Sequence, residues 1–194
     1  MFIFLKNKKI ILFFAFFTLL IIGFLIGFSL GKRSEDNFDS QTEQYSDDYL
    51  GISFDYLKNY NLYDEKNLKE KGIEGIVGLE KKNTPHIYCL VTRTKRAKSI
   101  DVPYEGLEDY IRSVMDSEKG NFSNLQIIPY KAKNYSGAKA TYEFSTLGGE
   151  VLKREMIVFA TSKNTYSLFC TSFASEFKYF EKEFEVFTRS FVGE

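Results

Sequence analysis

The sequence predicts an α+β domain, an antiparallel β-sheet packed by two main helices, preceded by one transmembrane helix. Three observations predict this architecture. An apolar stretch without charges occupies residues 10–30, alternating apolar runs recur through the rest of the chain, and two segments have the period of an amphipathic helix. Because 44% of the 194 residues are hydrophobic and 17% are aromatic, the chain can bury a substantial core.

The apolar stretch predicts a membrane anchor. At a rise of about 1.5 Å per residue, a helix over 10–30 spans a hydrocarbon core of about 30 Å. A cleaved signal peptide is the alternative, but the apolar core of a signal is only about 7–15 residues long. Three lysines precede the stretch, and Lys32 and Arg33 follow it. This excess predicts that residues 1–9 are cytoplasmic and that the globular domain is extracytoplasmic, on a single-pass protein of the cell membrane.

Three glycines of the anchor lie four residues apart: Gly23, Gly27 and Gly31. This spacing puts them near one face of a helix, where the missing side chains let a second helix approach closely. It predicts helix association, either as a dimer or with another protein; a plain tether is the alternative.

Residues 31–48 are predicted to form an acidic flexible linker, and residues 49–194 the globular domain. Six acids and no base lie within 34–50, and few apolar residues accompany them. Such a composition favours a solvated tether.

The globular part opens with a predicted strand in which Ile52, Phe54 and Tyr56 alternate with polar residues. Six further strands are predicted at 73–80, 86–94, 125–131, 138–146, 151–161 and 165–173. Turn residues at 134–137 and 147–149 favour an antiparallel meander of the later strands.

Two segments have a helical period instead. The segment 104–119 carries apolar residues three and four positions apart, with acids in its first turn. The second helix carries one stripe of phenylalanines: Phe177, Phe180, Phe184, Phe187 and Phe191. Such a stripe usually packs on a sheet, and a groove for a partner is the less common alternative.

The order of these elements resembles the PsbP-like family, that is, the extrinsic P subunit of photosystem II and its prokaryotic relatives. The resemblance covers about residues 49–192 and starts at the opening strand 50–56, Leu-Gly-Ile-Ser-Phe-Asp-Tyr. The helix 104–119, the hairpin at 138–143, the strand 164–173 and the final helix follow in the same order. The resemblance implies a small non-enzymatic module that is secreted or membrane-tethered and docks on a larger assembly.

Composition excludes several functions of the globular part. Residues 51–194 contain 21 bases and 20 acids, so a general nucleic-acid binder is not expected. One histidine and two cysteines are too few for an ordinary zinc site, and no phosphate loop or dinucleotide motif indicates a cofactor. We therefore expect a non-catalytic docking module acting on a larger protein or envelope assembly. The alternative is an extracytoplasmic hydrolase that uses His86 and carboxylates as its acid and base.

A basic run is the candidate binding site: Arg93, Lys95, Arg96 and Lys98. It would suit an anionic partner such as an acidic protein loop, a lipid headgroup or a cell-wall polymer, and a solvated loop is the alternative.

Cys89 and Cys170 lie in apolar strands and can pair only if those strands are neighbours. Because pairing requires Cα atoms within about 7 Å, we expect buried free thiols rather than a disulfide.

Overall fold

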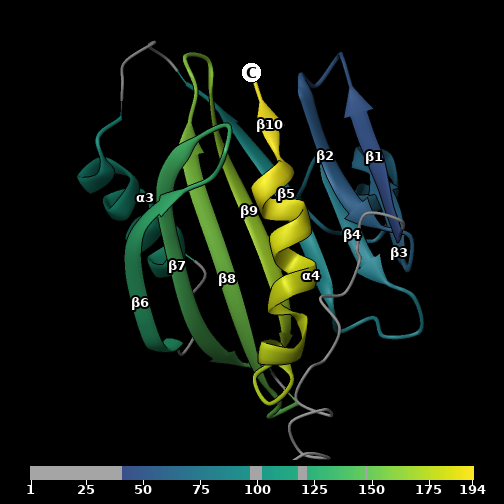
Figure 1. Cartoon of the computed structure of the whole chain (residues 1–194). Helices are drawn as coiled ribbons and strands as arrows, with labels where there is room; N and C mark the ends of the chain where they lie inside the picture. The colour runs from purple at the N-terminus through teal and green to yellow at the C-terminus, as the bar shows by residue number, and fades with distance from the viewer. Residues whose placement is uncertain (1–40, 97–101, 118–121, 147) are drawn as a thin grey trace, which may run out of the picture. The chain divides into compact units, whose positions relative to one another are not determined.

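The computed structural model describes residues 41–96, 102–117, 122–146 and 148–194 (Figure 1). The predicted anchor at 10–30, its three glycines and Lys98 lie outside the described residues. Among the described residues, no helix combines the length and the apolarity that a membrane span needs.

Ten strands and three helices follow one another in the described chain. They are β1 (Thr42–Asp47), β2 (Ile52–Leu57), β3 (Tyr60–Asp64), α2 (Glu65–Glu70), β4 (Val77–Lys81), β5 (Tyr88–Lys95), α3 (Tyr104–Ser117), β6 (Phe122–Lys131), β7 (Ser136–Ser145), β8 (Val151–Ala160), β9 (Asn164–Phe173), α4 (Phe177–Ser190) and β10 (Val192–Gly193).

The strands form two antiparallel sheets. The large sheet has the order β3-β4-β5-β9-β8-β7-β6, and the small sheet has the order β1-β2-β10. The α+β class and the meander from β6 to β9 are therefore confirmed. The prediction of one sheet is wrong, because the opening strand β2 pairs with β1 and β10 and not with the seven-stranded sheet.

The predicted linker 31–48 extends too far, because Thr42–Asp47 forms β1. Tyr45 is directly opposite Phe54 of β2, and the two rings lie 5.0 Å apart. Most residues of β1 are polar, and Glu43 is exposed, so composition alone indicated a tether. The strand forms because β2 supplies its hydrogen-bonding partner, and such long-range pairing leaves little trace in a polar sequence.

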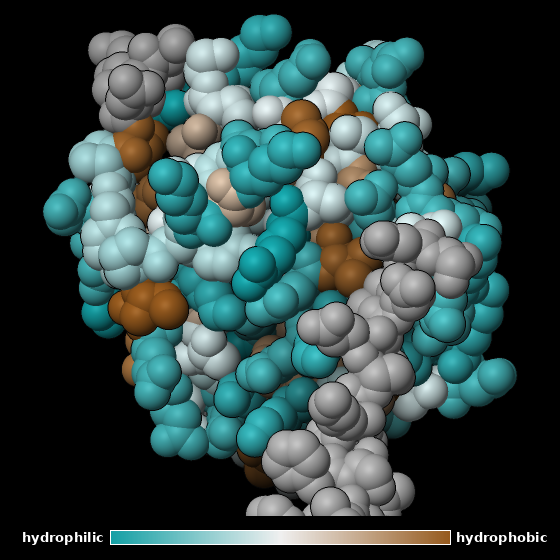
Figure 2. Space-filling view, in the orientation of Figure 1, coloured by the Kyte–Doolittle hydropathy of each residue, from teal (hydrophilic) through white to brown (hydrophobic). Residues whose placement is uncertain are grey.

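The helix α4 packs on one face of the large sheet, in front of β8 and β9 in Figure 1. Phe191, which follows the helix, contacts Phe159 of β8 and Tyr166 of β9, with ring centroids 5.7 Å apart in each pair. Phe187 also contacts Phe54 of β2, so α4 joins the small sheet to the large one. The prediction that the phenylalanine stripe packs on a sheet is confirmed. The molecular face that carries α4 is largely hydrophilic (Figure 2).

The helix α3 packs on the opposite face of the large sheet. Leu107, Ile111 and Met115 lie in one buried cluster with residues of β7, β8 and β9, among them Met156 and Val158. Because alternate residues of a strand point to opposite faces, Ile157 and Phe159 of the same strand belong to the α4 side. Both predicted helices therefore cover the sheet, one on each face.

Cys89 and Cys170 form a disulfide, so the expectation of free thiols is wrong. The two residues are directly opposite each other on β5 and β9, with Cα atoms 4.1 Å apart. The bond joins positions 81 residues apart in the sequence. Sequence patterns predicted both strands but could not show that β5 pairs with β9.

Candidate functional site

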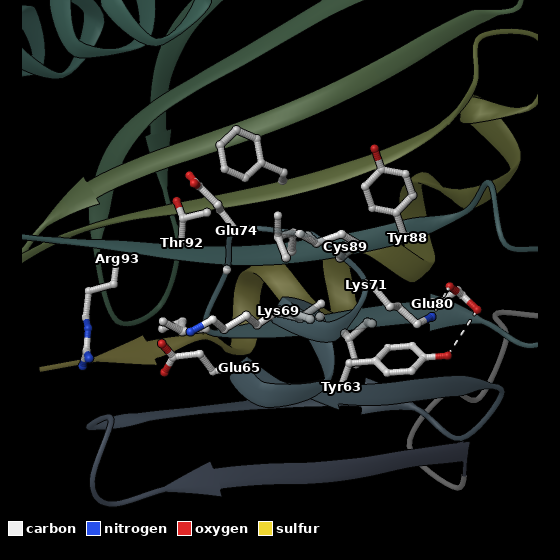
Figure 3. Close-up of a pocket in the computed structure, with 18 of the residues that line it drawn as sticks. Tyr63, Glu65, Lys69, Lys71, Glu74, Glu80, Tyr88, Cys89, Thr92 and Arg93 are labelled. Atoms are coloured by element: carbon white, nitrogen blue, oxygen red, sulfur yellow. Dashed lines mark hydrogen bonds and ion pairs between the residues drawn. The ribbon is translucent and has the colours of Figure 1, made fainter. Parts of the chain in front are cut away.

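A groove of about 1280 Å³ lies on the face of the large sheet that carries α3. Its floor is formed by strands β4, β5, β8 and β9, and includes Leu90 and Phe169, which lie opposite each other on β5 and β9. The helix α3 contributes Tyr110 and Val114 to one wall. The opposite wall is formed by α2 and the loop that follows it (Figure 3).

Two glycines allow the conformation of the loop 71–76, which forms this wall and is called the wall loop below. Gly72 ends α2 with a φ of +72°, a conformation that L side chains rarely adopt. Gly75 lies against the side chain of Leu90, and a Cβ added there would come within 2.5 Å of its Cδ1. The main chain of Ile76 then donates a hydrogen bond of 2.8 Å to the carbonyl of Val91. This packing explains why the strand predicted at 73–80 begins only at Val77: the preceding residues form the wall of the groove.

Arg154 of β8 lines the groove and contacts three other strands. Its guanidinium donates to the hydroxyls of Thr171 at 3.0 Å, Tyr88 at 3.1 Å and Tyr142 at 3.4 Å. It also lies over the ring of Phe144, 4.7 Å from its centroid. Such a network holds the charged side chain in a defined position.

Charged side chains occupy the rim. Lys71 and Glu80 form an ion pair of 3.3 Å, and the ammonium of Lys71 lies 3.9 Å from the ring centroid of Tyr63. Figure 3 shows this group at one end of the groove and Arg93 at the other. Hydrogen bonding by Tyr63 raises the pKa of Lys71, and Glu80 acts in the same direction. The groove therefore combines apolar side chains with charged ones, which suits a ligand that has both characters.

The basic run has a different role at each position. Arg93 donates a hydrogen bond of 3.0 Å to the carbonyl of Leu50, and Arg96 donates one of 2.6 Å to the carbonyl of Thr161. Arg93 thereby joins β5 to the turn between β1 and β2, and Arg96 joins the end of β5 to the turn between β8 and β9. Both arginines therefore contribute to the fold. Lys95 at the end of β5 is exposed, and of the three described members of the run Arg93 alone lines the groove.

His86 does not line the groove. Its ring stacks on Phe173, with centroids 4.1 Å apart, and its Nε2 lies 3.1 Å from a carboxylate oxygen of Glu176 at the start of α4. These contacts fasten the loop between β4 and β5 to the helix. These contacts join His86 to one aromatic ring and one carboxylate, and neither contact brings a serine, threonine or cysteine beside it.

The carboxylates of α4 are also separated from the groove. Glu183 accepts hydrogen bonds from Lys81 at 2.7 Å and from the hydroxyl of Tyr60 at 2.9 Å, on the opposite face of the sheet. Glu185 pairs with Arg189 on the exposed side of the helix. Among the described residues, no group of three or more histidine, cysteine or acidic side chains could hold a metal ion.

The Tyr60 contact predicts a loss of stability at alkaline pH. Burial raises the pKa of Tyr60, and the negative charge of Glu183 raises it further. Below about pH 10 the phenol of Tyr60 is protonated in the folded protein and in the unfolded chain. Above about pH 10 the unfolded chain loses this proton, whereas the folded protein keeps it. The free energy of unfolding should then fall by about 1.4 kcal/mol per pH unit for this group.

We expect Tyr60→Phe to reduce the slope of stability against pH between pH 10 and 11. Urea unfolding at several pH values measures this slope. Tyr179→Phe, at an exposed position of α4, is the control and should keep the slope of the natural chain. An unchanged slope in Tyr60→Phe would mean that Tyr60 ionises in the folded protein as it does in the unfolded chain.

No protein-family model matches the sequence, and no curated protein matches it either. Solved structures do match. A cyanobacterial PsbP (CyanoP) from Synechocystis has a TM-score of 0.55 and 14% identity, over 86% of this chain and 99% of that one. LpqN, which is involved in cell envelope biogenesis of Mycobacterium tuberculosis, has a TM-score of 0.53 and 11% identity, over 79% of this chain and 92% of that one.

A protein from Bacteroides thetaiotaomicron has a TM-score of 0.52 and 13% identity, over 79% of this chain and 49% of that one. At these identities the matches show the fold and not the function. They agree with the order of elements that the sequence indicated. The globular part of this chain has the PsbP-like fold.

Proposed function

We propose that this protein is a membrane-tethered extracytoplasmic module that binds its ligand in the groove and carries out no catalysis. The observation that carries the proposal is the groove of about 1280 Å³, whose floor spans four strands. It exceeds the roughly 300–1,000 Å³ of a common ligand pocket, and it combines apolar and polar side chains as ligand sites do. His86, which the hydrolase alternative uses, and Glu183 of α4 are held in contacts outside it.

The disulfide supports the extracytoplasmic placement. Disulfides persist in oxidising compartments and are rare in the cytosol. The bond between Cys89 and Cys170 is buried in the large sheet, with both residues at most 3% exposed. The domain therefore forms this bond as part of its folded core, as expected of a protein that folds outside the cytoplasm.

A photocrosslinking amino acid at Ile73 tests the groove. This side chain is 43% exposed on the wall loop and lines the groove. In intact cells we expect a specific adduct from position 73 and none from Tyr179, which is exposed on α4. Adding Thr92→Trp, which places a large ring on the floor, should abolish the adduct. An adduct that survives Thr92→Trp, or that forms equally from position 179, would contradict binding in the groove.

A cysteine at an exposed position tests the topology. Tyr179→Cys should react with a membrane-impermeant maleimide on intact cells, because this position is 68% exposed. Ile3→Cys is the control and should react only after lysis. Labelling of position 179 only after lysis would place the domain inside the cell.

A further inference from the structure

We propose that a second surface, separate from the groove, binds an anionic polymer that carries phosphate groups. The surface lies at one end of the large sheet and is formed by four lysines: Lys95, Lys131, Lys133 and Lys163. We call it the lysine end. Only Lys95 belongs to the basic run in the sequence.

The strand register brings these lysines to the same end of the sheet. Lys95 ends β5 opposite Asn164, and Lys163 precedes Asn164 in the turn between β8 and β9. The main chain of Arg96 donates a hydrogen bond of 2.9 Å to the carbonyl of Lys163, which joins these two segments directly.

The turn between β6 and β7 supplies the other two lysines. Lys131 is opposite Ser136 in this hairpin, and the residues that follow pair with the end of β8 through Ala138 and Val158. The ring of Tyr135 stacks on Phe159, with centroids 4.0 Å apart. The hairpin is thereby fixed beside the turn that carries Lys163.

The four lysines are available to a partner. All four are exposed, and among the described residues none of them forms an ion pair with a carboxylate. Three carboxylates at this end, Asp47, Asp48 and Glu194, belong to the small sheet and its turn. Unpaired lysines on three neighbouring turns create a positive potential that attracts negative charge.

The chemistry of the surface favours a polymer over a protein. Protein interfaces are depleted in lysine and enriched in aromatic anchors. The exposed residues described in the turns β6–β7 and β8–β9 are polar, among them Ser136 and Ser162. Lysine acts as a flexible point charge that binds phosphate without requiring a fixed geometry, which suits a repeating chain of phosphates.

The first described strand begins far from the lysine end. β1 starts at Thr42, opposite Leu57, and runs toward the turn at Gly51. Gly51 accepts a hydrogen bond of 3.0 Å from the main chain of Glu194, whose carbonyl accepts from Asn164 at the lysine end. The described chain therefore begins at the other end of the domain, about six residues or 20 Å of strand away.

Binding of labelled inorganic polyphosphate to the full chain in a non-ionic detergent tests the proposal. We expect saturable binding that weakens as the salt concentration rises, because lysines that neutralise phosphates release bound counterions. Changing all four lysines of the lysine end to glutamine should weaken binding about tenfold or more and flatten the dependence on salt. Circular dichroism of the variant should match that of the natural chain, because these side chains are exposed.

The control changes four exposed lysines elsewhere to glutamine: Lys66, Lys82, Lys178 and Lys182. It removes the same charge and should bind polyphosphate as the natural chain does. Equal weakening in both variants would overturn the proposal, since it would show attraction by net charge alone. Tighter binding to polyglutamate or to phosphatidylglycerol vesicles than to polyphosphate would overturn it in favour of an acidic protein or a lipid surface.

Discussion

Replacing both Cys89 and Cys170 with alanine is expected to lower the free energy of unfolding by about 2–4 kcal/mol. The bond closes a long loop, because its two residues are 81 positions apart, and so it restricts the unfolded chain strongly. It also joins β5 to β9 at the centre of the large sheet. Without it, strands β3, β4 and β5 are held to the rest of the sheet by hydrogen bonds and packing alone.

Urea unfolding of the double variant, followed by circular dichroism, measures this effect. The natural chain in a reducing agent should reach nearly the same stability, whereas the reducing agent should leave the double variant unchanged. A loss below about 0.5 kcal/mol would show that the disulfide contributes little beyond the hydrogen bonds of the sheet.

Phe54→Ala is expected to lower the free energy of unfolding by about 3–5 kcal/mol. The side chain is 1% exposed and packs between the small sheet and α4. Its ring centroid lies 4.9 Å from that of Phe187 and 5.0 Å from that of Tyr45. Removing the ring leaves a cavity at the point where the small sheet contacts the helix.

Thermal and urea unfolding of Phe54→Ala measure the loss. Tyr179→Ala removes an exposed aromatic ring from α4 and should change stability by less than about 0.5 kcal/mol. The double variant with Phe187→Ala should lose less than the two single variants together, because the two rings contact each other. Additive losses, or a small loss in Phe54→Ala, would show that the small sheet does not depend on this contact.

The two proposed sites lie on different parts of the domain. The groove lies on the face of the sheet that carries α3, whereas the lysine end is formed by turns at the ends of five strands. Because they share no lysine, groove variants and lysine variants can be tested separately. A protein with both sites would bind one ligand on the sheet while an anionic polymer holds the end of the domain.

The class of the fold and most of its elements were predictable from local sequence patterns. The alternation in β2 and the phenylalanine stripe of α4 are local patterns, and a period of two or of 3.6 residues follows directly from strand or helix geometry. The meander from β6 to β9 was also predictable, since short turns between consecutive strands leave antiparallel pairing as the simplest arrangement.

Contacts between residues distant in sequence could not be predicted in this way. The pairing of β5 with β9 places Cys89 beside Cys170, and the strand β1 forms because β2 lies next to it. The groove needs Arg154, Leu90 and the loop at Gly75 together, and none of these shares a local pattern with the others. Lys95 and Lys163 become neighbours because β5 pairs with β9. Contacts between strands distant in sequence depend on the free energy of the whole sheet, which periodicity within a single segment does not encode.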